Sequence, residues 1–386
     1  MTTNSYDAII IGSGSIGAPA AYYFAKSGLK TLVLDKAPST GQGSNKSAIG
    51  GIRATHSDPA KIRLCLRSID IISEWQDATG DDIEWYQGGY LFPIYSNEEN
   101  KRFLDLISLQ KHLGLDIDWI SREQVREIVP FLSGNDLIGA SYSPKDGNAS
   151  PLLVNHSFYN HAKQLGATFN FNENVTAIRS NETKVRCVIT TKAEYSTEII
   201  INAAGAFAKQ ISELAGSLVP VFPDSHEAGI TEAVKRFLDP MIVDIRQEPG
   251  SSNFYFYQHA TGQIVFCITP SPNIWGYDID ETSSFLPQVA QRLVMVMPSL
   301  AGLRVRRTWR GLYPMSPDGF PIIGQSRHHP EGFFQAVGMC GQGFMLGPGV
   351  GELLSRLVTK QLTHEDMEIL TQLSPDRSFS SEEMLK

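Results

Sequence analysis

The sequence lacks the features that mark several classes of protein. It has four cysteines, with no CxxC pair and no histidine at metal-ligand spacing, so neither a zinc site nor a disulfide framework is expected. It also lacks a basic excess: 33 Lys and Arg stand against 41 Asp and Glu, a formal net charge of -8. That balance gives no sign of nucleic acid or an anionic membrane surface as a partner.

Long apolar runs are missing as well. The first apolar run, residues 8–11, is too short for a signal peptide, and no stretch approaches the roughly 18 apolar residues of a transmembrane helix. We therefore expect a cytoplasmic protein with reduced thiols and no transmembrane segment. Its 386 residues, 42% hydrophobic and 19% charged, indicate a globular enzyme of one large or two intertwined domains.

Glycine is plentiful, and its first cluster has the spacing of a dinucleotide-binding turn. A short apolar strand, residues 6–12, leads into Gly12, Gly14 and Gly17, and the segment that follows has helical periodicity. The first glycine permits the turn, the second lets the backbone approach a pyrophosphate, and the third allows helix and strand to pack closely. The N-terminus of the helix then faces the phosphates.

An acidic residue follows at the distance that such a turn requires. The second apolar run, residues 30–36, contains Asp35, where the dinucleotide fold places an acid on the adenosine ribose. An acid here disfavours a 2′-phosphate, so NAD or FAD is favoured over NADP. The next segment, residues 37–58, is rich in Gly, Ser and Asn and is too long and polar for a plain connection.

From this loop onward the chain resembles the D-amino-acid oxidase superfamily of flavoproteins, in the branch of sarcosine oxidases, glycine oxidases and the β-subunits of proline and sarcosine dehydrogenases. Four motifs carry the resemblance in the same order: GIR at 51–53, EIIINAAGAFA at 198–208, TWRGLYPMSPDGFPIIG at 308–324 and GQGFMLGPGVGE at 341–352. The last motif has Gln342 where the family has histidine. The resemblance implies FAD as the cofactor.

The resemblance also implies a role for the second glycine cluster, around Gly341 and Gly343. Gly341 and Gly343 would let backbone amides and a helix N-terminus lie against the flavin ring, where negative charge develops on reduction. The apolar continuation VGELLSRLV, residues 350–358, favours a true helix over a flexible loop. The first glycine motif would hold the diphosphate and the second would stabilise the reduced ring.

The fold class that follows is α/β, or α+β overall, with a Rossmann-type FAD-binding domain and an inserted antiparallel-sheet substrate domain. Because the cofactor motifs lie far apart, the FAD-binding domain is expected in three segments, 1–85, 143–217 and 303–386. The substrate domain is expected at 86–142 and 218–302, which carry alternating, aromatic-rich runs typical of antiparallel strands.

The resemblance implies a set of FAD-binding residues drawn from these motifs and their neighbours. The set comprises Gly12, Gly14, Ser15, Ile16, Gly17, Asp35, Lys36, Ser44, Asn45, Ser47, Ala48, Gly50, Gly51, Val175, Ala204, Gly205, Gly311, Gly341, Gln342, Gly343, Phe344 and Met345.

Three residues are candidates for the chemistry. In sarcosine-oxidase-like enzymes the arginine that matches Arg53 pairs with the substrate carboxylate, and a planar guanidinium meets a carboxylate bidentately. Tyr255 matches a position whose hydroxyl projects over the flavin, and strand alternation puts Tyr257 on the same face. His226 could line the pocket. The plainer alternatives are an arginine bound to a local carbonyl or to FAD, a core tyrosine and a structural histidine.

Three departures from the family pattern bear on the cofactor. Gly311 occupies the place of the cysteine that tethers flavin in monomeric sarcosine oxidases, so the FAD is expected to be noncovalent. Met345 and Val265 occupy the places of two lysines, one that holds the carboxylate and one associated with oxygen activation. An electron acceptor other than oxygen is therefore expected.

The resemblance implies an FAD-dependent enzyme that oxidises the C–N bond of a small amino or imino acid, of the sarcosine, proline, glycine or D-amino-acid type, by hydride transfer to flavin N5. A dehydrogenase is favoured over an oxidase. One alternative is a 2-hydroxy acid or glycerol phosphate dehydrogenase, which needs a base, and His226 is the candidate. Another is an FAD-binding subunit of a larger complex that is inactive alone. The expected partners are the substrate, an unidentified electron acceptor and, in the last case, a second subunit.

Overall fold

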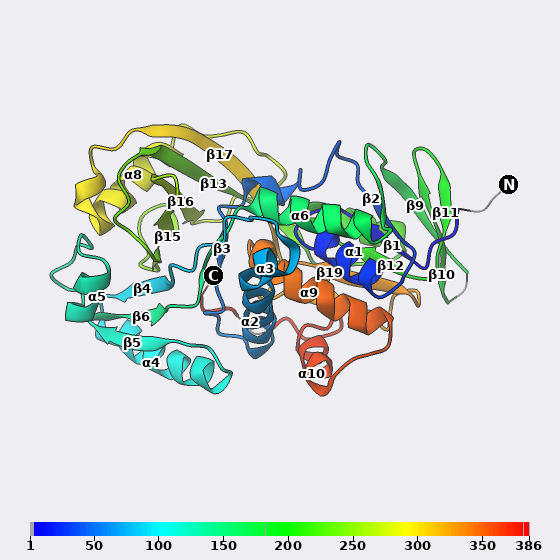
Figure 1. Cartoon of the computed structure of the whole chain (residues 1–386), viewed down its shortest axis with the longest axis horizontal. Coiled ribbons are helices and arrows are strands. Elements are labelled where there is room, and N and C mark those ends of the chain that lie inside the picture. The colour runs from blue at the N-terminus through cyan, green and yellow to red at the C-terminus, as the bar shows by residue number, and fades with distance from the viewer. Residues whose placement is uncertain (1–3, 182, 381, 386) are drawn as a thin grey trace.

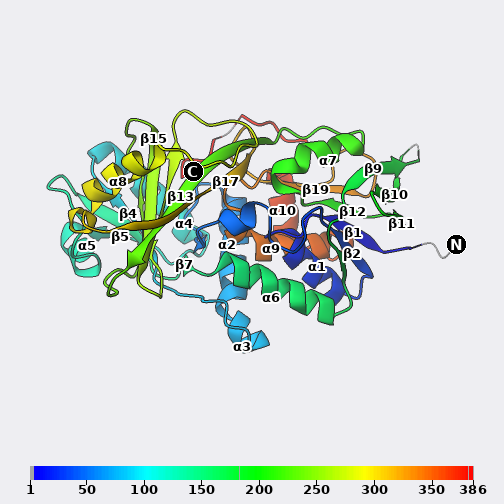
Figure 2. The same cartoon turned by 90° about the horizontal axis from the view of Figure 1, so that it is seen from above.

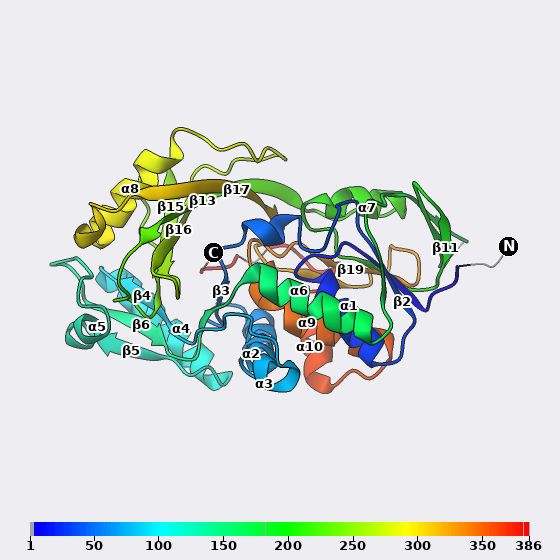
Figure 3. The same ribbon diagram turned by 45° about the horizontal axis from the view of Figure 1, so that its top comes forward.

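The chain forms two lobes, each built around one large β-sheet. The structure is a computed structural model that describes residues 4–181, 183–380 and 382–385. Figure 1 shows one sheet with α1 and α9 in one lobe and the second sheet with α4, α5 and α8 in the other. Two long strands, β13 and β17, run from the second lobe toward the centre of the molecule (Figure 3).

The first lobe contains a six-stranded sheet of the Rossmann type. In spatial order its strands are β18 (Ile322–Gly324), β19 (Phe333–Val337), β12 (Ile200–Asn202), β1 (Ala8–Ile11), β2 (Thr31–Leu34) and β8 (Thr168–Asn170). All neighbours pair in parallel except β18 with β19. The runs AIII and TLVL are buried at every position, because a parallel sheet is covered on both faces.

Helices cover one face of this sheet, and a small β-layer together with helix α7 covers the other (Figure 2). The helices of the lobe are α1 (Gly17–Lys26), α2 (Pro59–Ser73), α3 (Trp75–Thr79), α6 (Pro151–Gln164), α7 (Ala208–Leu214), α9 (Gly343–Val358) and α10 (His364–Gln372). The β-layer comprises β9 (Val175–Ser180), β10 (Val185–Thr190) and β11 (Glu194–Ser196). The 3₁₀ turns are η1 (Ser44–Ser47), η2 (Gly205–Phe207) and, in the second lobe, η3 (Pro298–Leu300).

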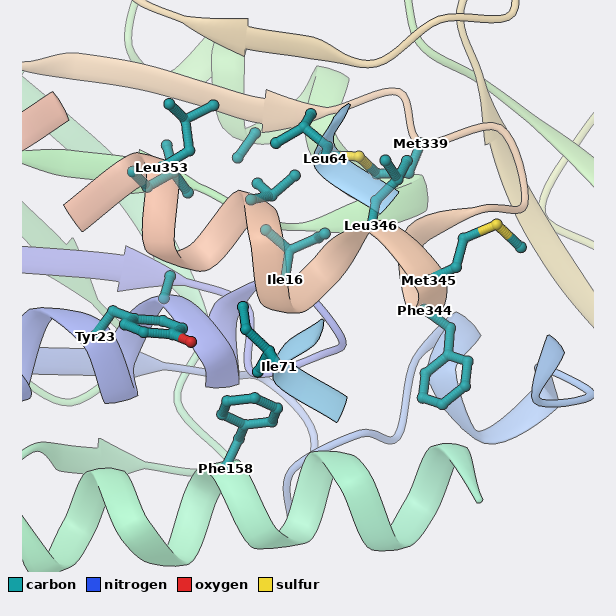
Figure 4. Close-up of a cluster of buried hydrophobic side chains, with 14 of the residues drawn as sticks. Ile16, Tyr23, Leu64, Ile71, Phe158, Met339, Phe344, Met345, Leu346 and Leu353 are labelled. Atoms are coloured by element: carbon teal, nitrogen blue, oxygen red, sulfur yellow. The ribbon is translucent and has the colours of Figure 1, made fainter. Parts of the chain in front are cut away.

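The glycine-rich helix α9 lies in the centre of this lobe and contacts both α1 and α2. A Cβ on Gly347 would lie 1.9 Å from the Ser15 carbonyl oxygen, and one on Gly349 would lie 2.5 Å from the Leu64 carbonyl oxygen. These glycines are therefore required for helix packing. Figure 4 shows the resulting apolar cluster, in which Leu346 of α9 lies near Ile16.

The second lobe contains an eight-stranded sheet. In spatial order its strands are β17 (Val305–Met315), β13 (Phe222–Ala233), β16 (Gln263–Pro270), β15 (Ser251–Gln258), β14 (Met241–Asp244), β4 (Tyr90–Ile94), β6 (Gly139–Ser143) and β5 (Asp118–Ser121). The sheet is antiparallel except where β14 pairs in parallel with β4. Helices α4 (Asn97–His112), α5 (Arg122–Ile128) and α8 (Phe285–Val296) accompany it, and a short ribbon of β3 (Gly51–Ile52) and β7 (Gly147–Asn148) lies close to the first lobe.

The predicted fold class is confirmed, with one refinement of the division into segments. Strand β17 pairs along its length with β13 in the eight-stranded sheet, although the sequence assigned residues 303–386 to the cofactor domain. We propose that the last boundary follows Met315 instead. Within the described part of the chain, no helix combines the length and apolar character that crossing a membrane requires.

Candidate active site

A cavity of about 450 Å³ lies where the two lobes meet. The first lobe contributes the turn between β1 and α1, the loop that contains η1, and the start of α9. The second lobe contributes side chains of β4, β13, β14, β15, β16 and β17. The site is therefore assembled from segments that are distant in sequence.

The first glycine turn shapes one end of this cavity. Gly12 has φ +104°, and a Cβ there would lie 2.4 Å from the Ala203 carbonyl oxygen, so only glycine fits. A Cβ on Gly14 would meet nothing within 4 Å, which leaves open space beside the backbone at the start of α1. The Asp35 carboxylate accepts hydrogen bonds from the Ser13 amide at 2.8 Å and the Ser13 hydroxyl at 2.6 Å, and so fixes this turn.

One member of the expected FAD-binding set does not line the cavity. Gly17 lies behind it, where a Cβ would come 1.8 Å from the Gly12 carbonyl oxygen, so its role is close packing of α1 against the turn. The other members, from Gly12 to Met345, line the cavity. Tyr90, Met241 and Tyr313 line the cavity as well, but they were not predicted from the sequence as site residues. No local pattern marks them, although Tyr313 lies within the 308–324 motif.

The polar groups around the cavity fit an elongated anionic cofactor such as FAD. Asn45 Oδ1 and Gln342 Oε1 are buried and have no hydrogen-bond partner within the described part of the protein. Buried polar atoms normally have partners, so a bound group is the natural source of them. The α1 and α9 N-termini both reach the cavity, and the first amides of a helix have no partner within it.

Arg53 follows β3 at the other end of the cavity and is 6% exposed. Its Nη2 donates to the Leu385 carbonyl oxygen at 2.7 Å, and its Nη1 contacts the Thr55 carbonyl oxygen and lies 3.3 Å from His56 Nδ1. No carboxylate of the described residues lies within ion-pair distance of Arg53. A buried cation without an acidic partner is costly, so this guanidinium is poised for an anion.

A second buried ionisable group lies behind the Arg53 loop. Asp146 is inaccessible to solvent, and its Oδ1 accepts a hydrogen bond from the Ala54 amide at 3.1 Å. Burial raises the pKa of this carboxyl to about 7, although the Ala54 amide and the Arg53 charge both act to lower it. Asp146 can therefore change its charge near neutral pH, close to the candidate anion site.

Two tyrosine hydroxyls meet on the wall opposite the first lobe. Tyr255 of β15 and Tyr313 of β17 line the cavity, and their hydroxyl oxygens are 2.6 Å apart. Burial raises the pKa of both phenols well above the ordinary value, so both stay protonated. Tyr255 and Tyr257 lie on the same face of β15, as the alternation predicted, and Phe254 and Phe256 pack on the other face.

His226 lies on β13, stacked on the Tyr313 ring with centroids 3.7 Å apart. Its Nε2 is 3.0 Å from Asp224 Oδ2, and because an ionised carboxylate only accepts, Nε2 must donate. Burial acts to raise the pKa of Asp224, but hydrogen bonds from His226, Asn273 and the Ile274 amide bring it below the ordinary value. The buried Nδ1 has no partner in the described structure, so it is available as an acceptor.

Val265 and Gly311 stand where the family resemblance placed a lysine and a cysteine beside the flavin, and only Gly311 lines the cavity. Val265 packs in an apolar cluster and does not line the cavity; Cys267, two residues further along the same face of β16, does. Gly311 lies against the η1 turn, where a Cβ would be 2.5 Å from Ser47 Cβ. Burial raises the pKa of Cys267 to about 12 and also raises that of Cys340, so neither thiol at the cavity is readily ionised.

Comparison with known proteins agrees with this geometry. The model of the DAO family, described as FAD dependent oxidoreductase, matches residues 7–357. Hydrogen cyanide synthase subunit HcnC of Pseudomonas aeruginosa is 27% identical over 399 residues, which cover 92% of this chain and 93% of that one. Glycine oxidase of Geobacillus kaustophilus is 25% identical over 375 residues, covering 95% and 96%. The crystal structure of L-proline dehydrogenase from P. horikoshii superimposes with a TM-score of 0.90 and 32% identity, over 97% of both chains.

Proposed function

The chain belongs to the DAO family of FAD-dependent oxidoreductases, and we propose that it oxidises the C–N bond of a small amino or imino acid. The observation that carries the proposal is Arg53, a buried guanidinium at the cavity whose hydrogen-bond partners in the described structure are neutral: two carbonyl oxygens, the Thr55 hydroxyl and a histidine nitrogen. Two similar proteins, a glycine oxidase and an L-proline dehydrogenase, are named for substrates of this class.

The residues around the first lobe's end of the cavity would hold FAD without a covalent bond. We assign the diphosphate to the amides at the start of α1, the adenosine to the region of Asp35, and the flavin to the start of α9 with Gln342. When bound, FAD supplies the two-electron acceptor for the oxidation.

Arg53, together with residues of the second lobe, orients the substrate and accepts its proton. Arg53 binds the carboxylate bidentately, which fixes the orientation of the Cα–N bond in the cavity. The Tyr255 and Tyr313 hydroxyls are protonated and can donate or relay one hydrogen bond. His226 Nδ1 accepts a proton from the substrate ammonium, and the Asp224 carboxylate stabilises the imidazolium that results.

The His226–Asp224 pair is also compatible with one alternative function. Oxidation of a 2-hydroxy acid or glycerol phosphate requires a base for the hydroxyl proton, and His226 Nδ1 is placed to serve. An anionic substrate of that class would also use Arg53. The second alternative is an FAD-binding subunit that has no activity alone. It is supported by the similarity to HcnC, which is named as a subunit of hydrogen cyanide synthase.

An anaerobic substrate screen separates the three. The FAD-loaded protein is mixed without oxygen with proline, sarcosine, glycine, D-amino acids, 2-hydroxy acids and glycerol phosphate in turn, and the oxidised flavin absorbance is followed. Bleaching by one of the amino or imino acids is expected. Bleaching by hydroxy acids or glycerol phosphate alone would contradict the proposal, and no bleaching at all would point to the inactive-subunit alternative.

A further inference from the structure

A buried ion pair links helix α2 to the segment Glu383–Leu385, close to Arg53. Lys61 Nζ lies 2.6 Å from Glu383 Oε2, and both side chains are fully buried. Glu383 Oε1 also accepts hydrogen bonds from the Ser57 amide at 3.0 Å and the Ser57 hydroxyl at 2.5 Å. Burial acts to raise the pKa of Glu383, but the Lys61 ammonium beside it holds that pKa down at about 2. The Leu385 amide donates to Glu383 Oε1 as well, at 3.1 Å, so Glu383 is ionised and held by four donors.

Two residues further on, this segment reaches the second lobe. The Leu385 side chain is 4% exposed and packs in the apolar cluster that contains Tyr90, Phe92 and Met241. Its carbonyl oxygen accepts the 2.7 Å hydrogen bond from Arg53 Nη2. The segment therefore has a charged anchor in one lobe, an apolar anchor in the other, and a direct contact with the guanidinium.

We propose that Glu383–Leu385 positions Arg53 for the substrate carboxylate, with Lys61 as the anchor of the segment. The inference rests on the proposed function, since it concerns the same anion site. A guanidinium has five donors in one plane: the Thr55 carbonyl oxygen and His56 Nδ1 lie against Nη1, and the Leu385 carbonyl oxygen occupies one donor of Nη2. The plane of Arg53 is thereby fixed, and the remaining donors are left for a ligand.

Loss of the segment should act on anion binding more than on FAD binding. Without the Leu385 carbonyl, Arg53 can rotate, so a carboxylate must order it on binding. Without the Glu383 carboxylate, Lys61 becomes an uncompensated buried cation, which disrupts the same corner. Among the described residues, those of the two glycine turns form no hydrogen bond or ion pair with Glu383 or the Lys61 ammonium, so the variants should keep their FAD and stay yellow.

The test measures carboxylate binding without turnover. Propionate, and propionamide as its uncharged counterpart, are titrated against the FAD-loaded protein while the flavin absorption spectrum is followed. The variants are Glu383→Gln, Glu383→Asp, Leu385→Ala and a chain shortened after Glu382. The matched control is Glu365→Gln, which breaks an exposed ion pair between α10 and Arg63 of the same helix α2.

We expect Glu383→Gln and the shortened chain to retain FAD and to bind propionate about tenfold more weakly, the order of one charge-assisted hydrogen bond. Glu383→Asp should recover part of the affinity, Leu385→Ala should lose part of it, and Glu365→Gln should match the parent. Propionamide affinity should be the same throughout. With a substrate, KM should rise while kcat changes little.

Two results would overturn the inference, and they are distinguishable. Parent-like propionate affinity in the FAD-loaded, folded Glu383→Gln and shortened chains would show that the segment does not position Arg53. If the parent protein binds no propionate, or if Arg53→Ala binds it equally well, Arg53 is not an anion site and the proposed function fails first.

Discussion

At the scale of single residues, the site is defined by buried polar groups whose hydrogen-bonding capacity or charge the fold leaves incomplete. Arg53 is buried with carbonyl partners, and His226 is buried with one nitrogen held by Asp224 and the other without a partner in the described structure. Burying such groups is unfavourable unless a ligand completes them. Together they require an anion and a proton donor within one cavity, which describes an amino acid with its carboxylate and ammonium.

Asp146 should make anion binding depend on pH near neutrality. Its folded pKa of about 7 lies above the ordinary value of 3.8, so above pH 7 it adds negative charge behind Arg53 and competes with the ligand. The affinity for propionate should fall as the pH rises through 7, and Asp146→Asn should flatten the profile. Burial lowers the pKa of His56 and raises that of Tyr90, so neither titrates in this window. An unchanged slope in Asp146→Asn would contradict this assignment.

The raised pKa of Asp146 also makes the free energy of unfolding depend on pH. Because the folded protein binds the Asp146 proton more tightly than the unfolded chain, the free energy of unfolding falls as the pH rises from about 4 to about 7. Glu383 has the opposite shift: its contribution is present above its ordinary pKa and is lost as the pH falls toward 2.

At the scale of elements, two glycine-rich helix starts form the cofactor's half of the cavity. The glycine turn at the start of α1 can be tested by comparing substitutions at Gly12 and Gly28, because both residues have positive φ, +104° and +83°. A Cβ on Gly12 would lie 2.4 Å from the Ala203 carbonyl oxygen, whereas one on Gly28 would meet nothing within 4 Å.

Gly12→Ala should therefore cost both backbone strain and a clash, and should lower FAD content sharply. Gly28→Ala should cost only the strain, roughly 1–2 kcal/mol, and should keep its FAD. Flavin content per chain and the thermal unfolding midpoint report the two effects. Equal loss of FAD in both variants would show that the strain, and not the close approach at Ala203, explains the requirement for glycine.

The sequence predicts an element well when neighbouring residues specify it, and poorly when contacts with residues far along the chain place it. The strand, turn and helix at residues 6–28 are specified by neighbouring residues, so periodicity and glycine spacing predict them. The place of β17 is set by its pairing with β13, in which Asp224 lies opposite Tyr313, 89 residues later in the chain, and no local pattern encodes this pairing. The contact of Arg53 with Leu385 spans 332 residues and is likewise invisible to local patterns.

At the scale of the whole molecule, the cofactor should be held by shape and hydrogen bonds alone. Gly311 has no side chain to attach, and burial keeps the Cys267 and Cys340 thiols protonated at the cavity. Acid precipitation should release all of the yellow colour into the supernatant. If the pellet stays yellow, Cys267→Ser and Cys340→Ser would show which thiol is bonded, and the noncovalent assignment would be wrong.

The protein should also react slowly with oxygen. Reduction of oxygen builds negative charge beside the flavin, and a fixed positive charge there would stabilise it. The lysines that line the cavity are Lys36 and Lys46, and Lys36 lies at the Asp35 end, 3.0 Å from the Phe207 ring centroid. Two arginines line it too: Arg310 is paired with Asp278, and a bound substrate or product carboxylate would neutralise the charge of Arg53. Stopped-flow mixing of substrate-reduced enzyme with aerated buffer should give slow re-oxidation, and a dye or quinone should give fast re-oxidation. Re-oxidation by air at the turnover rate would identify an oxidase.

The most direct test of the account compares an amino acid with its carboxamide as anaerobic reductants of the FAD-loaded protein and of Arg53→Ala. Loss of a buried charge-assisted pair typically costs about 2–5 kcal/mol. We expect the parent to prefer the acid strongly, and Arg53→Ala to stay yellow but to lose this preference while its reaction with the amide is unchanged. A variant that keeps the preference for the acid, or that is purified colourless, would contradict the assignment of Arg53 to the substrate.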